Sequence, residues 1–255
     1  MRLKSLLVES EEAVARVASL LKNQFRNDLP KLYRATDRDF DGQYTVREIR
    51  KGRKPIGGAA GAQLILDFLT QKKYDDVPKR SESKFAAAGN DEGRLNVFGD
   101  NEFLVFPDKT ADIASFEKDT KRARNDWENA LYMVKNDLTR KENGEFYYGT
   151  SEKKYDLIGE FFYLVFNEGK EKNLSFLKNN WKDLREEFKK AKKENPGIAS
   201  EISELINPSY LQMLKKQIEL GDSEVVFDGS KYLYVRKHFF DQHFEKRGSK
   251  WKSKG

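Results

Sequence analysis

The chain lacks cysteine altogether and has only two histidines among its 255 residues. Without cysteine it can form neither a disulfide nor a thiolate metal site, which fits a reducing compartment. His238 and His243 alone cannot build a histidine-rich metal site. No segment approaches the roughly 20 apolar residues that cross a bilayer, and the N-terminal segment becomes acidic at Glu9, too early for a secretory signal. We therefore expect a soluble cytoplasmic protein without a membrane partner.

Aromatic and charged residues are abundant instead. Eighteen phenylalanines, eleven tyrosines and three tryptophans argue against disorder, because each buries a large apolar area. The net charge is +6, and residues 236–255 hold seven Lys or Arg against two Asp or Glu. We interpret 241–255 as a basic tail, which either contacts nucleic acid or an acidic host protein or serves only as a solubilising terminus.

In the first 106 residues, the spacing of apolar residues predicts two helices and three short strands. The first 25 residues and Gln63–Lys72 have helical spacing, whereas Leu32–Ala35, Lys84–Ala88 and Phe103–Phe106 are strand-like. Residues 111–220 look mostly helical, with one face that begins at Ile113 and Phe116 and a heptad-like seam over 174–191 that leaves dimerisation open.

The period changes again near the C-terminus. Glu224–Phe227 and Tyr232–Val235 alternate like strands and flank Asp228–Gly229, a dipeptide that favours a hairpin turn. Strands at both ends of the chain with helices between them predict an α+β protein. We expect a core of residues 1–110 and 221–240, a helical insertion at 111–220 and the tail at 241–255.

Three kinds of polar residue occupy separate predicted strands in an order worth testing. Arg34 is on an early strand, Ser81 and Ser83 are on a second, and Glu224 is on a late one. Arginine can hold dinucleotide phosphates with its planar fork. Serine can orient a ribose, and a carboxylate near an anomeric carbon can stabilise an oxocarbenium-like state.

This R–S–E order resembles that of NAD-dependent ADP-ribosyltransferases. Residues 31–107 and 221–235 are similar to a group of phage-encoded proteins of this type through the following segments: Tyr33–Arg34–Ala35, Arg53–Lys54–Pro55, Arg80–Ser81–Glu82–Ser83–Lys84–Phe85, Phe98–Gly99, Val105–Phe106–Pro107, and Glu224 with Tyr232 and Tyr234. The chain departs from the pattern at Ala35 (glycine in the group), at Ala86–Ala88 (a threonine segment) and at Phe98 (tyrosine).

The resemblance implies an ADP-ribosyltransferase-like mixed sheet and transfer of ADP-ribose from NAD to a macromolecular acceptor, either host protein or nucleic acid. It implies a phage-encoded protein that acts in the host bacterial cytoplasm. Its expected catalytic residues are Glu224, Arg34, Ser81 and Ser83. Its expected NAD-binding residues are Arg34, Arg53, Arg80, Ser81, Ser83, Phe85 and Asp222.

A second motif competes with this interpretation. Residues 37–48 match a twelve-residue EF-hand calcium loop, with candidate ligands Asp37, Asp39, Asp41, Gln43, Thr45 and Glu48 around Gly42. Pro30 opposes the incoming helix, Gly52 and Pro55 oppose the outgoing one, and no second loop is present. The alternative function is a non-enzymatic binding protein, which uses either calcium at this loop or the basic tail.

Overall fold

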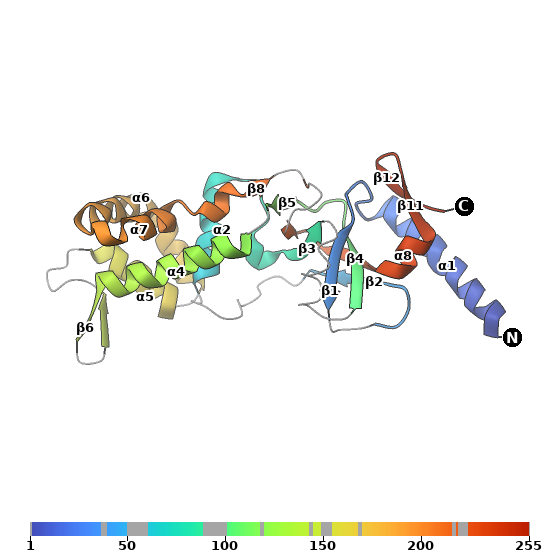
Figure 1. Ribbon diagram of the computed structural model, residues 1–255, viewed down its shortest axis with the longest axis horizontal. Helices are drawn as coiled ribbons and strands as arrows, with labels where there is room; N and C mark the ends of the chain where they lie inside the picture. The colour runs from blue at the N-terminus through green and yellow to red at the C-terminus, as the bar shows by residue number, and fades with distance from the viewer. Residues whose placement is uncertain are drawn as a thin grey trace. The chain divides into compact units, whose positions relative to one another are not determined.

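The computed structural model describes residues 2–36, 40–49, 61–88, 101–117, 120–142, 145–148, 155–167, 170–215, 218 and 224–254. The chain divides into two compact units, and Figure 1 labels the helices and strands that belong to them. The first, here the sheet unit, comprises Met1–Lys51, Glu82–Lys118 and Lys215–Gly255. The second, here the helical unit, comprises Gly52–Ser81 and Asp119–Leu214. The helical unit therefore includes 61–81, which the sequence analysis assigned to the core, while 111–118 belong to the sheet unit.

The sheet unit is built on a sheet with the strand order β2-β10-β4-β1-β3-β9-β5-β8. The strands are β1 (Leu32–Thr36), β2 (Tyr44–Glu48), β3 (Lys84–Ala88), β4 (Asn101–Pro107), β5 (Ile113–Phe116), β8 (Leu214–Lys215), β9 (Glu224–Phe227) and β10 (Lys231–Arg236). The predicted strands at 32, 84 and 103 are confirmed, as is the α+β class. The sheet is antiparallel, however, so the expected mixture of parallel and antiparallel pairs is wrong.

The predicted hairpin around Asp228–Gly229 is also wrong. β9 pairs with β3 and β5, whereas β10 pairs with β2 and β4. The connection is held by polar contacts that separate the two strands: the backbone N–H of Asp228 donates to the carbonyl of Asp112 (3.2 Å), and the carboxylate of Asp108 accepts the N–H groups of Ser230 and Lys231. Tertiary hydrogen bonds thus override the local hairpin signal.

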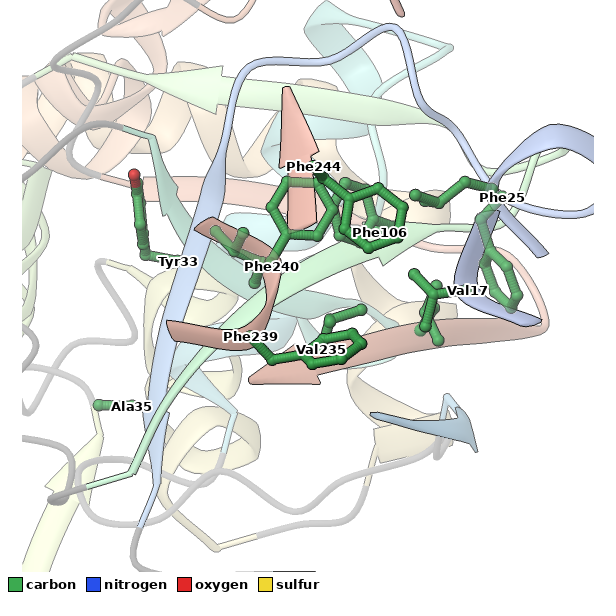
Figure 2. Packing of buried hydrophobic residues seen from close by; sticks show 12 residues of the cluster. Val17, Phe25, Tyr33, Ala35, Phe106, Val235, Phe239, Phe240 and Phe244 are labelled. Atoms are coloured by element: carbon green, nitrogen blue, oxygen red, sulfur yellow. The ribbon is translucent and has the colours of Figure 1, made fainter. Parts of the chain in front are cut away.

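Two helices and the alternate residues of the central strands form an apolar core on one face of this sheet (Figure 2). The helices are α1 (Arg2–Asn23) and α8 (Lys237–His243). The buried members are Val17, Leu21, Phe25, Tyr33, Ala35, Leu104, Phe106, Leu233, Val235, Phe239, Phe240 and Phe244. Phe240 stacks on Phe244 with ring centroids 4.7 Å apart. Since side chains alternate along a strand, this core fixes which residues face the other way.

The opposite face has its own buried cluster. It contains Leu32, Ile49, Ala86, Ala88, Phe103, Val105, Val225, Phe227, Tyr232 and Tyr234. Arg34 lies between Tyr33 and Ala35 of the first core, so alternation directs its side chain to this second face. The sheet is therefore apolar on both faces, and its polar positions are exceptions that need an explanation.

The basic C-terminal segment is folded. Strands β11 (Phe244–Arg247) and β12 (Lys250–Ser253) form a two-stranded hairpin, and Gly248 takes a φ of 63° at its turn. The backbone N–H of Trp251 donates to the carbonyl of Asn27 at 3.0 Å. The C-terminal segment is therefore not frayed, because Phe244 and Trp251 pack against the core around α8.

The helical unit is made of α2 (Ala62–Lys73), α4 (Thr120–Leu138), α5 (Asp156–Asn167), α6 (Lys170–Glu194), α7 (Ala199–Ile206), the short turns η2 (Pro196–Ile198) and η3 (Ser209–Gln212), and the hairpin β6 (Thr139–Glu142) and β7 (Glu145–Tyr148). The seam of α6 packs inside this unit, with Phe188 against Phe161 and Trp181 against Phe68. The mostly helical character predicted for 111–220 is confirmed in the described residues, and the exceptions are strand β5 (Ile113–Phe116), the hairpin of β6 and β7, and η3 and β8 after residue 208. Strand β5, at four residues, is too short for periodicity to separate it from the helix that follows.

Candidate functional site

Arg34 lies in the middle of β1, opposite Phe103 of β4. Its Nη1 donates a hydrogen bond to the carbonyl oxygen of Phe85 on β3 at 2.7 Å. One nitrogen of the guanidinium is thereby fixed to the neighbouring strand. An arginine held in this way keeps further N–H donors for a ligand, because the fork carries five.

The register adds three more cations to the face that Arg34 occupies. Arg47 of β2 is opposite Tyr232, Arg236 of β10 is opposite Phe103, and Lys84 of β3 is opposite Phe227. The described strand positions on this face hold no aspartate or glutamate. We call this side of the sheet, with Arg34, Arg47, Lys84 and Arg236, the Arg34 face.

Aromatic rings lie between these cations. The guanidinium carbon of Arg47 is 5.6 Å from the ring centroids of both Phe40 and Tyr234. The ammonium of Lys84 lies 4.9 Å from the ring of Tyr232 and 5.8 Å from that of Tyr234. Each distance is in the range in which a ring's quadrupole attracts a cation.

The rings also contact one another. Phe40 stacks on Phe103 at 4.9 Å, Phe103 lies 5.4 Å from Tyr234, and Tyr234 meets Tyr232 edge-on at 4.9 Å. Burial raises the pKa of Tyr234 far above its usual range, although the charges of Arg34 and Arg47 act in the opposite direction. Tyr234 is therefore a neutral hydroxyl at physiological pH and adds no negative charge to the face.

Arg236 connects this face to the segment before β2. Its Nε donates to the carbonyl of Gly42 at 2.9 Å, and its Nη2 donates to the carbonyl of Phe40 at 2.8 Å. The guanidinium is 5.3 Å from the ring of Phe40. This arrangement holds Phe40 over Phe103, so that an aromatic side chain from outside the strands completes the Arg34 face.

The remaining residues of the R–S–E order do not converge, and the serines are not on a strand as expected: Ser81 is in the 3-10 turn η1 (Arg80–Glu82) and Ser83 precedes β3, while Glu224 begins β9. β1, β3 and β9 are consecutive in the sheet. Ser83 precedes Lys84, which pairs with Phe227, whereas Glu224 is three residues earlier on β9. Four residue steps separate their levels in the sheet, about 13 Å along the strands.

Alternation also separates Glu224 from Arg34. Val225 and Phe227 belong to the cluster on the Arg34 face. Glu224 therefore points to the other side of β9, at the position opposite Phe116 of β5.

The other expected NAD-binding residues are in different surroundings. The backbone N–H of Arg80, in η1 (Arg80–Glu82), donates to Oδ1 of Asp67 at 3.0 Å. Phe85 contributes its carbonyl to Arg34, but alternation turns its ring away from the Arg34 face. Arg53, Asp222 and the side chain of Ser81 lie outside the described residues.

In the calcium-loop alternative, residues 44–48 form the second half of the loop, and the structure has them as strand β2. Thr45 and Glu48 are three residues apart in that strand, so their side chains point to opposite faces. Asp41 and Gln43 precede the strand, and Asp37 and Asp39 lie outside the described residues. Within the described ranges no group of three or more His, Asp or Glu side chains is placed to hold a metal ion. The calcium-loop interpretation of 37–48 stays a prediction, because its first half lies partly outside the described residues.

The sequence analysis found Arg34 but missed Arg47, Lys84 and Arg236 as its companions. Arg47 was hidden within the calcium-loop motif, and the others needed the strand register. Comparisons with protein-family models, curated proteins and solved structures gave no match to this chain. Among the helices of the described residues, none has the length and apolar character to cross a membrane.

Proposed function

We propose that the sheet unit binds a nucleotide, with NAD as the first candidate, on the Arg34 face. The observation that carries this proposal is the charge of the Arg34 face. Its described strand positions hold four cationic side chains and no Asp or Glu. Phosphates are the natural counter-ions for such a set, and arginine forks match phosphate oxygens in pairs. Phe40 and the tyrosines supply the apolar surface that a base or nicotinamide ring requires.

We extend the proposal to ADP-ribosyl transfer from NAD to a macromolecular acceptor. It is supported by the R–S–E order of the sequence and by the adjacency of β1, β3 and β9. The ADP-ribosyltransferase-like fold, the phage origin and the roles of Ser81, Ser83 and Glu224 belong to the same proposal. The position of Glu224 on the other face makes transfer a separate question from binding, and each therefore has its own test.

The binding test is calorimetric titration of NAD into the protein, with calcium and with a chelator. We expect saturable binding that does not depend on calcium, that Arg34→Ala weakens at least about tenfold and that Arg34→Lys restores only in part, because lysine lacks the fork. Arg16→Ala is the matched control, because Arg16 is exposed on α1 and its replacement removes the same charge from the same unit.

NAD binding that is unchanged in Arg34→Ala, or absent in the wild type, would overturn the binding proposal. Heat from calcium alone would favour the non-enzymatic alternative at 37–48. The transfer test compares nicotinamide release by the wild type and by Glu224→Gln at saturating NAD. Loss of release with unchanged NAD affinity would support transfer, whereas NAD binding without any release by the wild type would leave a nucleotide-binding protein.

A further inference from the structure

A basic pocket lies elsewhere in the sheet unit, at the C-terminal end of α1. Its volume is about 810 Å³, and its lining includes Lys22, Arg26, Lys109, Lys250 and Lys252. Asp28 is the single carboxylate among the described lining residues. None of the four cations of the Arg34 face contributes to it. The pocket is thus a separate concentration of positive charge.

Backbone hydrogen bonds between distant segments fix the walls of this pocket. The N–H of Arg26 donates to the carbonyl of Pro107 at 2.8 Å, and the N–H of Lys109 donates to the carbonyl of Gln24 at 3.0 Å. On the other side, Trp251 donates its backbone N–H to Asn27 and its Nε1 to the carbonyl of Leu29, both at 3.0 Å. The lysines therefore project from a rigid frame of α1, the end of β4 and β12.

The one acid in the lining is already neutralised. Arg26 donates from Nε and Nη2 to the two carboxylate oxygens of Asp28, both at 2.8 Å. Hydrogen bonding to Arg26 lowers the pKa of Asp28 against its burial, and the charge of Lys250 lowers it further. Lys109 donates to the backbone carbonyl of Lys22, a neutral acceptor, at 2.7 Å. Because Asp28 is paired with Arg26, it offsets little of the positive charge of the four lysines in the pocket.

Two of the lysines that line the pocket lie on the C-terminal hairpin. Lys250 and Lys252 are exposed and two residues apart on β12, so they project from the same side of the strand about 7 Å apart. Trp251 between them turns inward to Phe240, with ring centroids 5.4 Å apart. The aromatic ring anchors the strand, and the two lysines are presented to solvent.

We propose that this pocket binds the phosphodiester backbone of a nucleic acid without sequence preference. Its volume of about 810 Å³ leaves room for more than one phosphate group. Lysines supply single, strongly hydrated charges to successive phosphates, whereas protein–protein interfaces are depleted in lysine. The net charge of +6 favours the same partner through long-range attraction.

The test is fluorescence anisotropy with a labelled mixed-sequence oligonucleotide of roughly 20 nucleotides, as single-stranded DNA, single-stranded RNA and duplex DNA. The salt concentration is varied from about 50 to 200 mM. We expect the double variant Lys250→Ala with Lys252→Ala to weaken binding about tenfold and to reduce the salt slope by about 2. The control is Lys190→Ala with Lys193→Ala, two exposed lysines of α6 whose removal changes the net charge equally.

Three outcomes would overturn the proposal: no oligonucleotide binding at the lowest salt, equal weakening in the control, or competition by a poly-glutamate peptide or inorganic phosphate as effective as that of the oligonucleotide. Thermal unfolding of both double variants verifies that they fold. The result is independent of the NAD proposal, because Arg34→Ala should keep oligonucleotide affinity and the lysine variant should keep NAD affinity.

Discussion

Replacing Asp108 with alanine tests how the sheet unit holds its unusual strand order. The Asp108 carboxylate, 4% exposed, accepts hydrogen bonds from the backbone N–H groups of Thr110, Ser230 and Lys231 at 3.0, 2.7 and 2.9 Å. It also accepts the hydroxyl groups of Thr110 and Ser230. This one side chain therefore ties the end of β4 to the start of β10, two strands that pair with each other.

The size of the effect follows from these five bonds. A hydrogen bond to a charged group contributes about 1.5 to 3 kcal/mol, and a buried donor left unpaired costs a similar amount. The two hydroxyl groups can rotate toward other acceptors, but the three backbone donors cannot move without moving the strands. We therefore expect Asp108→Ala to lower the free energy of unfolding of the sheet unit by about 3 to 5 kcal/mol.

Urea unfolding at neutral pH, followed by tryptophan fluorescence and circular dichroism, measures the loss. Asp112→Ala is the control, because Asp112 is exposed four residues away and loses the same charge while its backbone N–H remains. A difference between the two variants below about 1 kcal/mol would refute the reasoning.

The same side chain makes a pH prediction. Burial by itself raises the pKa of Asp108, but the hydrogen bonds from Thr110, Lys231 and Ser230 outweigh burial and hold that pKa at about 2. The native state thus binds a proton less readily than the unfolded chain. The stabilisation from Asp108 is complete above the pKa of an unfolded aspartate, about 4, and is lost as the pH falls toward 2. The difference in free energy of unfolding between the wild type and Asp108→Ala should therefore decrease as the pH falls from about 4 to about 2.

Three further changes test neighbouring parts of the structure. Gly229→Ala places a Cβ 2.7 Å from the Asp108 carboxylate at a φ of 103°, and should destabilise the sheet unit by about 1 to 3 kcal/mol in urea unfolding; a smaller penalty in the Asp108→Ala background would show that the two are coupled. Phe188→Ala removes a ring, 1% exposed, that meets Phe161 edge-on, and should cost the helical unit about 3 to 5 kcal/mol. Arg236→Lys loses the fork to Phe40 and Gly42 and should weaken NAD binding in calorimetry, while wild-type affinity would exclude Arg236 from the site.

Elements with a clear apolar period could be predicted from the sequence. Gln63–Lys72 and Lys84–Ala88 are near their observed bounds in α2 and β3. Strand β2 was not predicted, because its residues Tyr44–Glu48 also form the second half of the calcium-loop pattern at 37–48. The hairpin prediction at Asp228–Gly229 was wrong for a different reason. The conformation of this connection depends on contacts with Asp108 and Asp112, more than a hundred residues away.

Only part of the candidate site could be predicted from the sequence. Arg34 could be identified from the R–S–E order, because that order is a property of the sequence itself. Its companions could not, because Arg47 and Arg236 reach the Arg34 face only through the pairing of β10 with β2 and β4. Such pairings join segments far apart in sequence, and no local pattern specifies which strand lies next to which.

The register of β9 limits how Glu224 and Arg34 could act on the same NAD molecule in the transferase proposal. Val225 and Phe227 are each 0% exposed on the Arg34 face, so a one-residue slip that brought Glu224 to that face would move both away from their cluster. The apolar pattern of β9 therefore opposes a direct partnership of Glu224 with Arg34. If Glu224→Gln abolishes nicotinamide release, NAD must either extend past the end of β9 or change how that strand pairs. Amide hydrogen exchange in β9 with and without NAD separates these routes, because only re-pairing exposes the amides that now bond to β3 and β5.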